Sequence, residues 1–431
     1  MKASRSIPRP LRYAALFLAC ILAGVLLKAA VCALPAGKMH DTIPRSIEQI
    51  EENRYMPRKT GKDDQLLSGG ECNYLRMSDI AGEFPAFRAA MTNTVRVEKE
   101  DGSVEQRDNT IYWWGAVTVL RPFLILLTYE QTISLFQVAV FCLMIAACIR
   151  LYRALGAAAA MLFALSLFLV SLQTAVQTLS TMIPFALSFA GILFCVRWER
   201  DPKKQCVVLF VLGFLTGYLD WMTTNIITYA YPAVAALLLL HRNGAFKKRY
   251  EPFAFVCRGG VLWALSYGLT IVSKWVLTAL ILREGTILEG FLRALNDITK
   301  EGSAVPEKLG DFLYQAALRN VQRLELVSLL PRGADTAVMC LFALLAVAAV
   351  AAGWIGKRTM GKCVSSAAGL AGLAPFAWIA VFHGHSYVHY WYTYRMLGAF
   401  LFGCAMAFYM LLRSRKEAAA PAKAREKEAA E

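Results

Sequence analysis

Long apolar segments recur along the whole chain, and this feature limits the possible folds more than any other. Hydrophobic residues make up 57% of the 431 residues, and charged residues only 18%. A helix needs about 20 mainly apolar residues to cross a bilayer, and several segments approach or reach that length. Because lipid offers the backbone no hydrogen-bond partner, such segments fold as helices. The sequence therefore predicts an all-α polytopic membrane protein.

The apolar segments predict about ten transmembrane helices. Basic residues precede the first segment, whose apolar run is too long for a cleaved signal peptide, so we expect an uncleaved helix that starts in the cytoplasm. Both termini are then cytoplasmic, and the protein crosses the cytoplasmic (inner or plasma) membrane many times. The predicted helices cover residues 13–34, 132–149, 156–173, 182–197, 205–220, 225–241, 259–282, 336–355, 363–382 and 396–413.

The net charge of +15 does not indicate a nucleic-acid partner, because its placement follows membrane topology. Short cytoplasmic loops carry an excess of Lys and Arg. Fourteen Lys and Arg residues lie in four connections on one side, at 150–153, 197–204, 242–258 and 357–362. None lies in three short connections on the opposite side, at 174–181, 221–224 and 383–394.

The segment 111–128 decides this assignment of sides. It is nearly long enough to span, but Arg121-Pro122 interrupts it. If it crossed, every later connection would change side, against the charge distribution, so we expect it to lie along the outer interface. The predicted organisation is one membrane domain at 1–413, with a first outer loop at 35–110, an interfacial segment at 111–128 and a second outer loop at 283–335, followed by a cytoplasmic tail at 414–431.

Local patterns predict short elements within the outer loops. Thr42 is suited to cap a short helix. Alternating residues at 94–106 flank Asp101-Gly102, which predicts a β-hairpin. Apolar residues recur at helical spacing from Ile287 to Ile298, as in a helix that lies on a membrane surface.

The stretch 383–395 concentrates polar and aromatic residues between two predicted spans. It holds three of the five histidines, together with Tyr392 and Arg395. His385 and His389, four residues apart, would share one helix face and could hydrogen-bond a phosphate or a sugar hydroxyl. No acidic pair stands beside them, so we predict no metal site there, although the sequence leaves a divalent metal open.

Ionisable residues also mark the outer ends of other predicted spans. Asp220 ends one span, and Lys274 lies about two turns inside another. A charge within a span usually faces a cavity or a partner, but Lys274 could also extend outward to the interface. Arg121 and Arg395 each lie where a predicted outer interface begins. An arginine at such a position binds either lipid phosphates or a substrate.

Asp41 stands out among the outer carboxylates by its position. Only six residues separate it from Leu34 at the end of the first predicted span. The chain therefore holds Asp41 near the membrane surface, at the level of any head group whose tail stays in the bilayer. We predict a catalytic role for Asp41 on this ground.

Several short motifs resemble the GT-C class of membrane glycosyltransferases, and most closely a group of uncharacterised bacterial membrane proteins assigned to that class. The resemblance implies many spans, a large first outer loop, an acidic residue soon after the first span, and a sugar donor carried on polyprenyl phosphate. The most specific motif is His385-Ser386-Tyr387-Val388-His389-Tyr390-Trp391-Tyr392-Thr393-Tyr394-Arg395. The others are Tyr112-Trp113-Trp114-Gly115, Leu120-Arg121-Pro122, Leu215-Thr216-Gly217-Tyr218-Leu219-Asp220 and Ser273-Lys274-Trp275.

The first outer loop departs from that group. Its members carry a Leu-Asp-Asn-aromatic-Thr-Asp signature where this chain has Gly70-Glu71-Cys72-Asn73-Tyr74. If the acidic signature is catalytic, Glu71 takes its place. The large soluble C-terminal domain of some class members has no counterpart here.

The sequence and the resemblance together predict a glycosyltransferase on the outer face of the cytoplasmic membrane. Its partners would be a polyprenyl-phosphate-linked sugar donor, membrane lipid, and a cell-envelope glycan, lipid or protein acceptor. Asp41 or Glu71 would act as general base. No cofactor is required, because phosphate is already a good leaving group. A transporter or flippase for a lipid-linked or anionic solute, and a non-enzymatic assembly factor, are the alternatives. The residues expected to bind substrate are Arg121, Asp220, Lys274, His385, His389, Tyr392 and Arg395.

Overall fold

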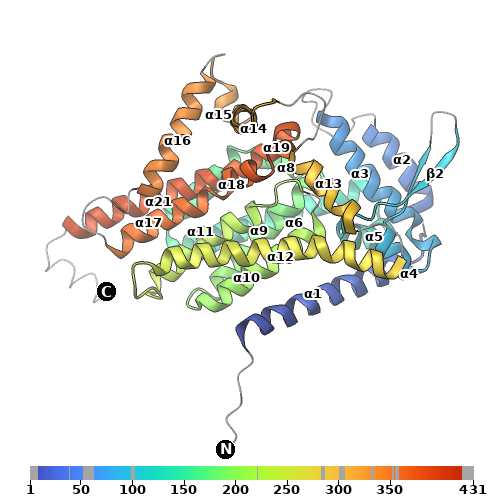
Figure 1. Cartoon of the computed structure of the whole chain (residues 1–431), viewed down its shortest axis with the longest axis horizontal. Coiled ribbons are helices and arrows are strands. Elements are labelled where there is room, and N and C mark those ends of the chain that lie inside the picture. The colour runs from blue at the N-terminus through green and yellow to red at the C-terminus, as the bar shows by residue number, and fades with distance from the viewer. Residues whose placement is uncertain are drawn as a thin grey trace, which may run out of the picture.

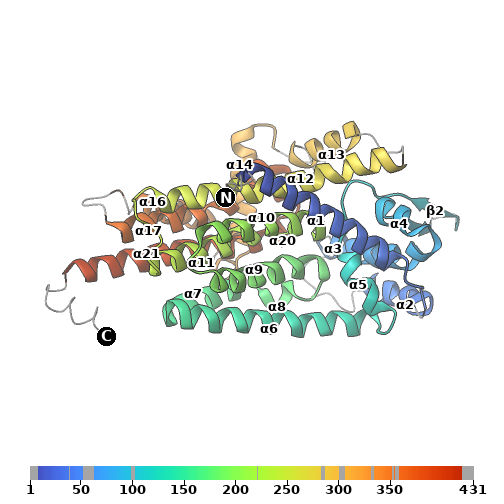
Figure 2. The same ribbon diagram turned by 90° about the horizontal axis from the view of Figure 1, so that it is seen from below.

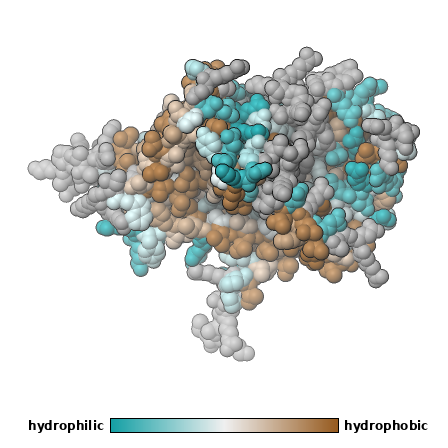
Figure 3. Space-filling view, turned by 45° about the horizontal axis from the view of Figure 1, so that its top comes forward, coloured by the Kyte–Doolittle hydropathy of each residue, from teal (hydrophilic) through white to brown (hydrophobic). Residues whose placement is uncertain are grey.

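The protein is a bundle of helices that carries a small two-stranded hairpin at one end (Figures 1 and 2). The structure is a computed structural model, and it describes residues 8–37, 39–51, 63–98, 102–220, 222–282, 287–299, 306–331, 334–351, 354 and 359–419. Hydrophobic residues cover much of the bundle surface, whereas hydrophilic residues gather over the hairpin end (Figure 3). This distribution is the one expected of a helical membrane protein with a solvated outer part.

Six helical segments among the described residues are long and apolar enough to cross a membrane. They confirm the prediction of an all-α, multi-pass membrane protein, whereas the ten-span arrangement stays a prediction. The segments are α1 (Arg9–Cys32), α6 (Tyr129–Leu155), α9 (Leu179–Arg197), α12 (Glu251–Leu282), α17 and α18 (Met360–Gly372 and Ala374–Val381), and the segment Tyr390–Ser414, which includes most of α21 (Leu397–Ala419). Two shorter apolar helices are α7 (Ala157–Phe168) and α16 (Asp335–Ala351).

Helix α11 (Ile227–Arg242) lies at the centre of the bundle. Every residue from Ile227 to Leu240 is buried. A helix that is apolar on all sides is stable only inside a larger core, so its neighbours shield α11 from lipid. Those neighbours include α9, α12, α17 and α10 (Pro202–Leu219).

Glycines allow the closest contacts between helices. A Cβ atom at Gly213 of α10 would lie 2.3 Å from the Trp263 carbonyl oxygen of α12. A Cβ at Gly403 of α21 would lie 2.5 Å from the Cα of Gly372 in α17. Small residues at these positions let backbones approach, which is how membrane helices gain packing energy.

The first outer loop folds at the hairpin end. The hairpin prediction is confirmed, because β1 (Val95–Glu98) pairs antiparallel with β2 (Val104–Arg107). The prediction for Thr42 is wrong, because α2 begins at Met39 and Thr42 lies in its first turn. Its hydroxyl donates back to the Met39 carbonyl at 3.5 Å. The other elements are α3 (Asp63–Ile80), η1 (Ala81–Glu83) and α4 (Ala86–Thr92).

The segment 111–128 contains one short helix, α5 (Ala116–Leu124), of nine residues. At a rise of about 1.5 Å per residue it is roughly 13 Å long, which is too short to cross a bilayer. The interfacial position of this segment relative to the membrane stays a prediction.

The second outer loop contains a helix, α13 (Ile287–Thr299), where the apolar spacing predicted one. Leu288 and Phe291 are 63% and 56% exposed; the side chain of Ile298 is outside the described set. The position of α13 on a membrane surface stays a prediction. Five further short helices are α8 (Leu172–Ala175), α14 (Leu309–Gln322), α15 (Glu325–Ser328), α19 (His383–Val388) and α20 (Tyr390–Thr393), and η2 (Tyr394–Met396) leads into α21.

Candidate functional site

The loop after α10 contacts the stretch 383–395. Asp220 ends α10 and accepts hydrogen bonds from the backbone N–H and the hydroxyl of Thr223, at 3.0 and 2.7 Å. Met222 has a φ of +77°, a conformation that costs energy for a bulky L-residue and is common near functional sites. Its carbonyl accepts from Nε2 of His385 at 2.7 Å.

The predicted histidines form a buried stack with Tyr392. The rings of His385 and His389 lie 4.6 Å apart, and His389 stacks on Tyr392 at 5.2 Å. The Tyr392 hydroxyl lies 3.2 Å from Nε2 of His385. Because the Met222 carbonyl can only accept, Nε2 of His385 carries a proton. The structure therefore brings His385, His389, Tyr392 and the Asp220 loop together, as the sequence predicted for a common site.

Arg395 provides the clearest sign of a ligand. It is 7% exposed, and its Nη2 donates to the Thr174 hydroxyl at 3.0 Å. Its Nε and Nη1 are buried and have no hydrogen-bond partner among the described residues. A buried charged donor without a partner is costly, and a guanidinium is shaped to bind the oxygens of a phosphate or carboxylate. These two nitrogens are suited to an anion.

Helix α14 holds this stretch in place. The Asn320 amide donates to the Ser386 carbonyl at 2.9 Å and accepts from the Thr393 hydroxyl at 2.7 Å. Arg319 stacks on the ring of Tyr387 at 3.7 Å and donates to its hydroxyl at 2.8 Å. Sequence reasoning missed both α14 residues, since nothing local links them to a segment more than sixty residues away.

Glu71 is a buried anchor between α3 and the start of α9. It is 0% exposed, and its carboxylate accepts from the N–H groups of Leu179 and Ser180, at 3.1 and 3.0 Å. The hydroxyls of Tyr129 and Ser180 also donate to it. Burial raises the pKa of the Glu71 carboxyl, and the hydrogen bonds from Ser180 and Tyr129 lower it in part. These four donors occupy the acceptor positions that a general base needs, so the geometry favours a structural role.

Lys274 neither faces a described cavity nor extends to the interface, the two positions that its sequence suggested. Its side chain is 0% exposed. The ammonium donates to the Met91 carbonyl in the last turn of α4 and lies 5.3 Å from the Trp113 ring. Helix ends leave carbonyls without partners, so Lys274 acts as a cap for α4.

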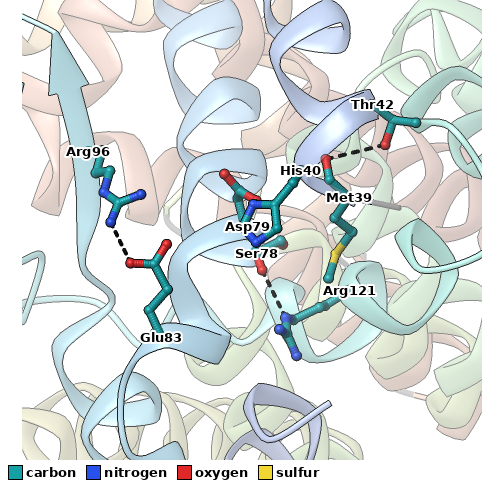
Figure 4. Close-up of polar contacts among 8 residues, drawn as sticks. All are labelled: Met39, His40, Thr42, Ser78, Asp79, Glu83, Arg96 and Arg121. Atoms are coloured by element: carbon teal, nitrogen blue, oxygen red, sulfur yellow. Dashed lines mark hydrogen bonds and ion pairs between the residues drawn. The ribbon is translucent and has the colours of Figure 1, made fainter. Parts of the chain in front are cut away.

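Arg121 also binds the ends of helices, whereas the sequence predicted a position at the outer interface. It is 0% exposed. Its Nε donates to the Ser78 carbonyl at 2.8 Å, and its Nη1 donates to the Val31 carbonyl. These carbonyls lie in the last turns of α3 and α1, so Arg121 joins the two helices to α5. Figure 4 shows the contact with Ser78.

Asp41 lies apart from the histidine stack. It is exposed in the first turn of α2. Both ribbon views show α2 near the hairpin end and away from α14, and Figure 2 shows it away from α20 as well (Figures 1 and 2). The adjacent His40 pairs with Asp79 through Nδ1 and Oδ1 at 2.7 Å (Figure 4). Sequence reasoning missed this pair, which lies 39 residues apart in the chain.

Within the described part of the chain, no group of three or more His, Cys, Asp or Glu side chains could hold a metal ion. Comparisons with protein-family models, curated proteins and solved structures found no match to this chain. The fold and the site thus define a multi-pass helical membrane protein with a buried arginine, Arg395 of η2, beside Thr174 of α8.

Proposed function

We propose that this protein is a membrane glycosyltransferase that uses a sugar carried on polyprenyl phosphate. In the proposed ten-span arrangement it transfers that sugar to a cell-envelope acceptor on the outer face of the cytoplasmic membrane. The observation that supports the proposal best is Arg395, whose buried guanidinium has two nitrogens without a partner. A phosphate that leaves the sugar is an anion suited to those nitrogens.

In the proposed chemistry, Arg395 stabilises the leaving phosphate and a carboxylate accepts the proton of the acceptor. The acceptor hydroxyl attacks the anomeric carbon, and the bond from that carbon to the phosphate oxygen breaks. Arg395 stabilises the negative charge that builds on the phosphate. His385 and Tyr392 orient the sugar phosphate through hydrogen bonds. The acceptor proton passes to a carboxylate, and the reaction needs no metal.

Two carboxylates compete for the role of base. Asp41 is exposed and, in the proposed ten-span arrangement, near the membrane surface, but it lies apart from the histidine stack. Asp220 is 6% exposed and its loop contacts His385. Loss of a general base typically costs about a hundred- to ten-thousandfold in rate. Turnover of Asp41→Asn beside Asp220→Asn assigns the base, and normal turnover in both variants would remove both residues from the mechanism.

The test of the proposed function is transfer of a radiolabelled sugar from polyprenyl phosphate in proteoliposomes. Arg395→Met should weaken donor binding by about tenfold or more, because a charged hydrogen bond contributes about 1.5–3 kcal/mol. Arg197→Met is the matched control, because this arginine lies in the last turn of α9, at the opposite end of that helix from Ser180, whose carbonyl accepts from Thr223. Absence of transfer with every donor, or unchanged donor affinity in Arg395→Met, would contradict the proposal.

Transport of a lipid-linked or anionic solute is the second candidate. The two buried nitrogens of Arg395 would suit an anionic solute as well as a leaving phosphate. The span 360–381, in contrast, continues through Leu373 with helical hydrogen bonds, whereas transporters often bind substrate where helices are broken near the midplane. The same proteoliposomes distinguish the two functions. Movement of a labelled lipid-linked sugar between leaflets without transfer to an acceptor would favour transport.

A further inference from the structure

A cavity of about 520 Å³ lies at the other end of the bundle from the histidine stack. It is bounded by the ends of α6 and α11 and by the later turns of α21. Helix α6 has 27 residues and is about 40 Å long; in the proposed ten-span arrangement the cavity and the histidine stack therefore lie on opposite sides of the bilayer. The volume is in the range of about 300–1,000 Å³ that is usual for small-molecule sites.

The cavity is strongly basic. Its lining includes Arg153, His241, Arg242 and Arg413, and none of the described lining residues is acidic. Helix dipoles account for part of this, because Arg153 and Arg242 lie in the last turns of α6 and α11. Arg413 lies six residues before the end of α21. All three arginines are solvent-exposed, and a cavity that they line without a carboxylate attracts anions.

The surroundings of the cavity indicate that this anion carries an apolar tail. Ile149 on α6 and Leu412 on α21 are 45% and 58% exposed beside it, as expected of side chains that face lipid. Tyr152 lines the cavity and is 59% exposed, and tyrosine is enriched where membrane meets water. An amphiphile could therefore place its anionic group in the cavity and its chains along α6 and α21.

We propose that this basic cavity binds the phosphate group of an anionic phospholipid, in the leaflet opposite the histidine stack. Basic pockets between membrane helices are known to bind acidic head groups. Lipid bound here would contact α6, α11 and α21 together. The inference does not depend on the proposed glycosyltransferase activity.

Retention of phospholipid by the purified protein tests the proposal. The protein is equilibrated in micelles with phosphatidylglycerol or phosphatidylcholine, and bound lipid is counted by native mass spectrometry. Wild type should retain phosphatidylglycerol preferentially. Each arginine removed should weaken that binding about fivefold, and Arg153→Gln with Arg413→Gln together about 25-fold. Glycerol 3-phosphate and inorganic phosphate serve as competitors without chains.

Arg197→Gln is the matched control, because Arg197 also lies in the last turn of a helix but does not line the cavity. Its phosphatidylglycerol binding should equal that of wild type. An equal loss in Arg197→Gln and Arg153→Gln would mean general surface attraction and would overturn the site. Complete competition by millimolar inorganic phosphate would overturn the lipid assignment. Equal retention of the two lipids by wild type would overturn the proposal even if the variants failed to fold.

Discussion

Replacement of Glu71 should damage the fold before it affects any chemistry. Four donors converge on this carboxylate, which is 0% exposed. In Glu71→Gln the hydroxyl of Tyr129 or Ser180 can rotate to accept from the new amide. The backbone N–H of Leu179 or Ser180 cannot do so and loses its acceptor. One buried donor without a partner costs about 1–3 kcal/mol, which is the loss expected for Glu71→Gln.

Glu71→Ala should cost more, because all four donors lose their acceptor and a cavity remains. We expect a loss of about 4 kcal/mol or more, which is a large part of the stability of a typical domain. Glu51→Gln is the matched control. Glu51 pairs with Arg76 at 3.1 Å and is 57% exposed, so its loss should be within about 1 kcal/mol.

The reactivity of Cys72 reports whether α3 stays docked in the Glu71 variants. All eleven cysteines are free, and burial raises the pKa of the Cys72 thiol to about 12, so it should react slowly while α3 stays docked. Labelling of a variant that retains only Cys72 should become faster in Glu71→Gln and not in Glu51→Gln. If Glu71→Gln melted like wild type and was labelled slowly but transferred no sugar, the structural role would be refuted and a catalytic role for Glu71 supported.

The contribution of Glu71 to the free energy of unfolding should also change with pH in one direction. Burial raises the pKa of Glu71 above its ordinary value of 4.5, so the folded state binds more protons than the unfolded state from pH 4.5 up to the folded pKa. The free energy of unfolding that Glu71 contributes should therefore fall as pH rises through this window. Melting curves of Glu71→Gln should lack that slope.

Three other predictions follow from packing and topology. Lys274→Met should leave donor affinity unchanged, measured by donor binding in detergent, while melting shows a loss of about 1–3 kcal/mol for the carbonyl it caps. Gly213→Ala should destabilise the protein by about 1–3 kcal/mol, because the new Cβ meets backbone at 2.3 Å, whereas Gly268→Ala has open space and should be neutral or better. Ser103→Cys and Glu307→Cys, on a cysteine-free background, should both react with an impermeant maleimide from outside; reaction at only one would contradict the ten-span arrangement.

Features that depend on neighbours in sequence could be predicted from the sequence. The hairpin follows from Asp101-Gly102 between alternating residues, and the histidine stack follows from residues within one short stretch. Contacts across the chain could not be predicted in this way. Arg395 meets Thr174 at a separation of 221 residues, and Glu71 meets Ser180 at 109. The apolar periodicity of one helix is compatible with many different neighbouring helices. Only the packed bundle determines which helices are in contact.

The same limit explains why three cations with similar sequence signals have different roles. Arg121 and Lys274 both donate to carbonyls in the last turns of other helices, where unpaired acceptors and a negative dipole favour a positive charge. Arg395 differs from both, because its Nε and Nη1 are buried and have no partner among the described residues, whereas Arg121 leaves only its Nη2 in that state. An anion would bind those two nitrogens of Arg395, which is why this arginine, and not the other two, is the one proposed to hold a phosphate.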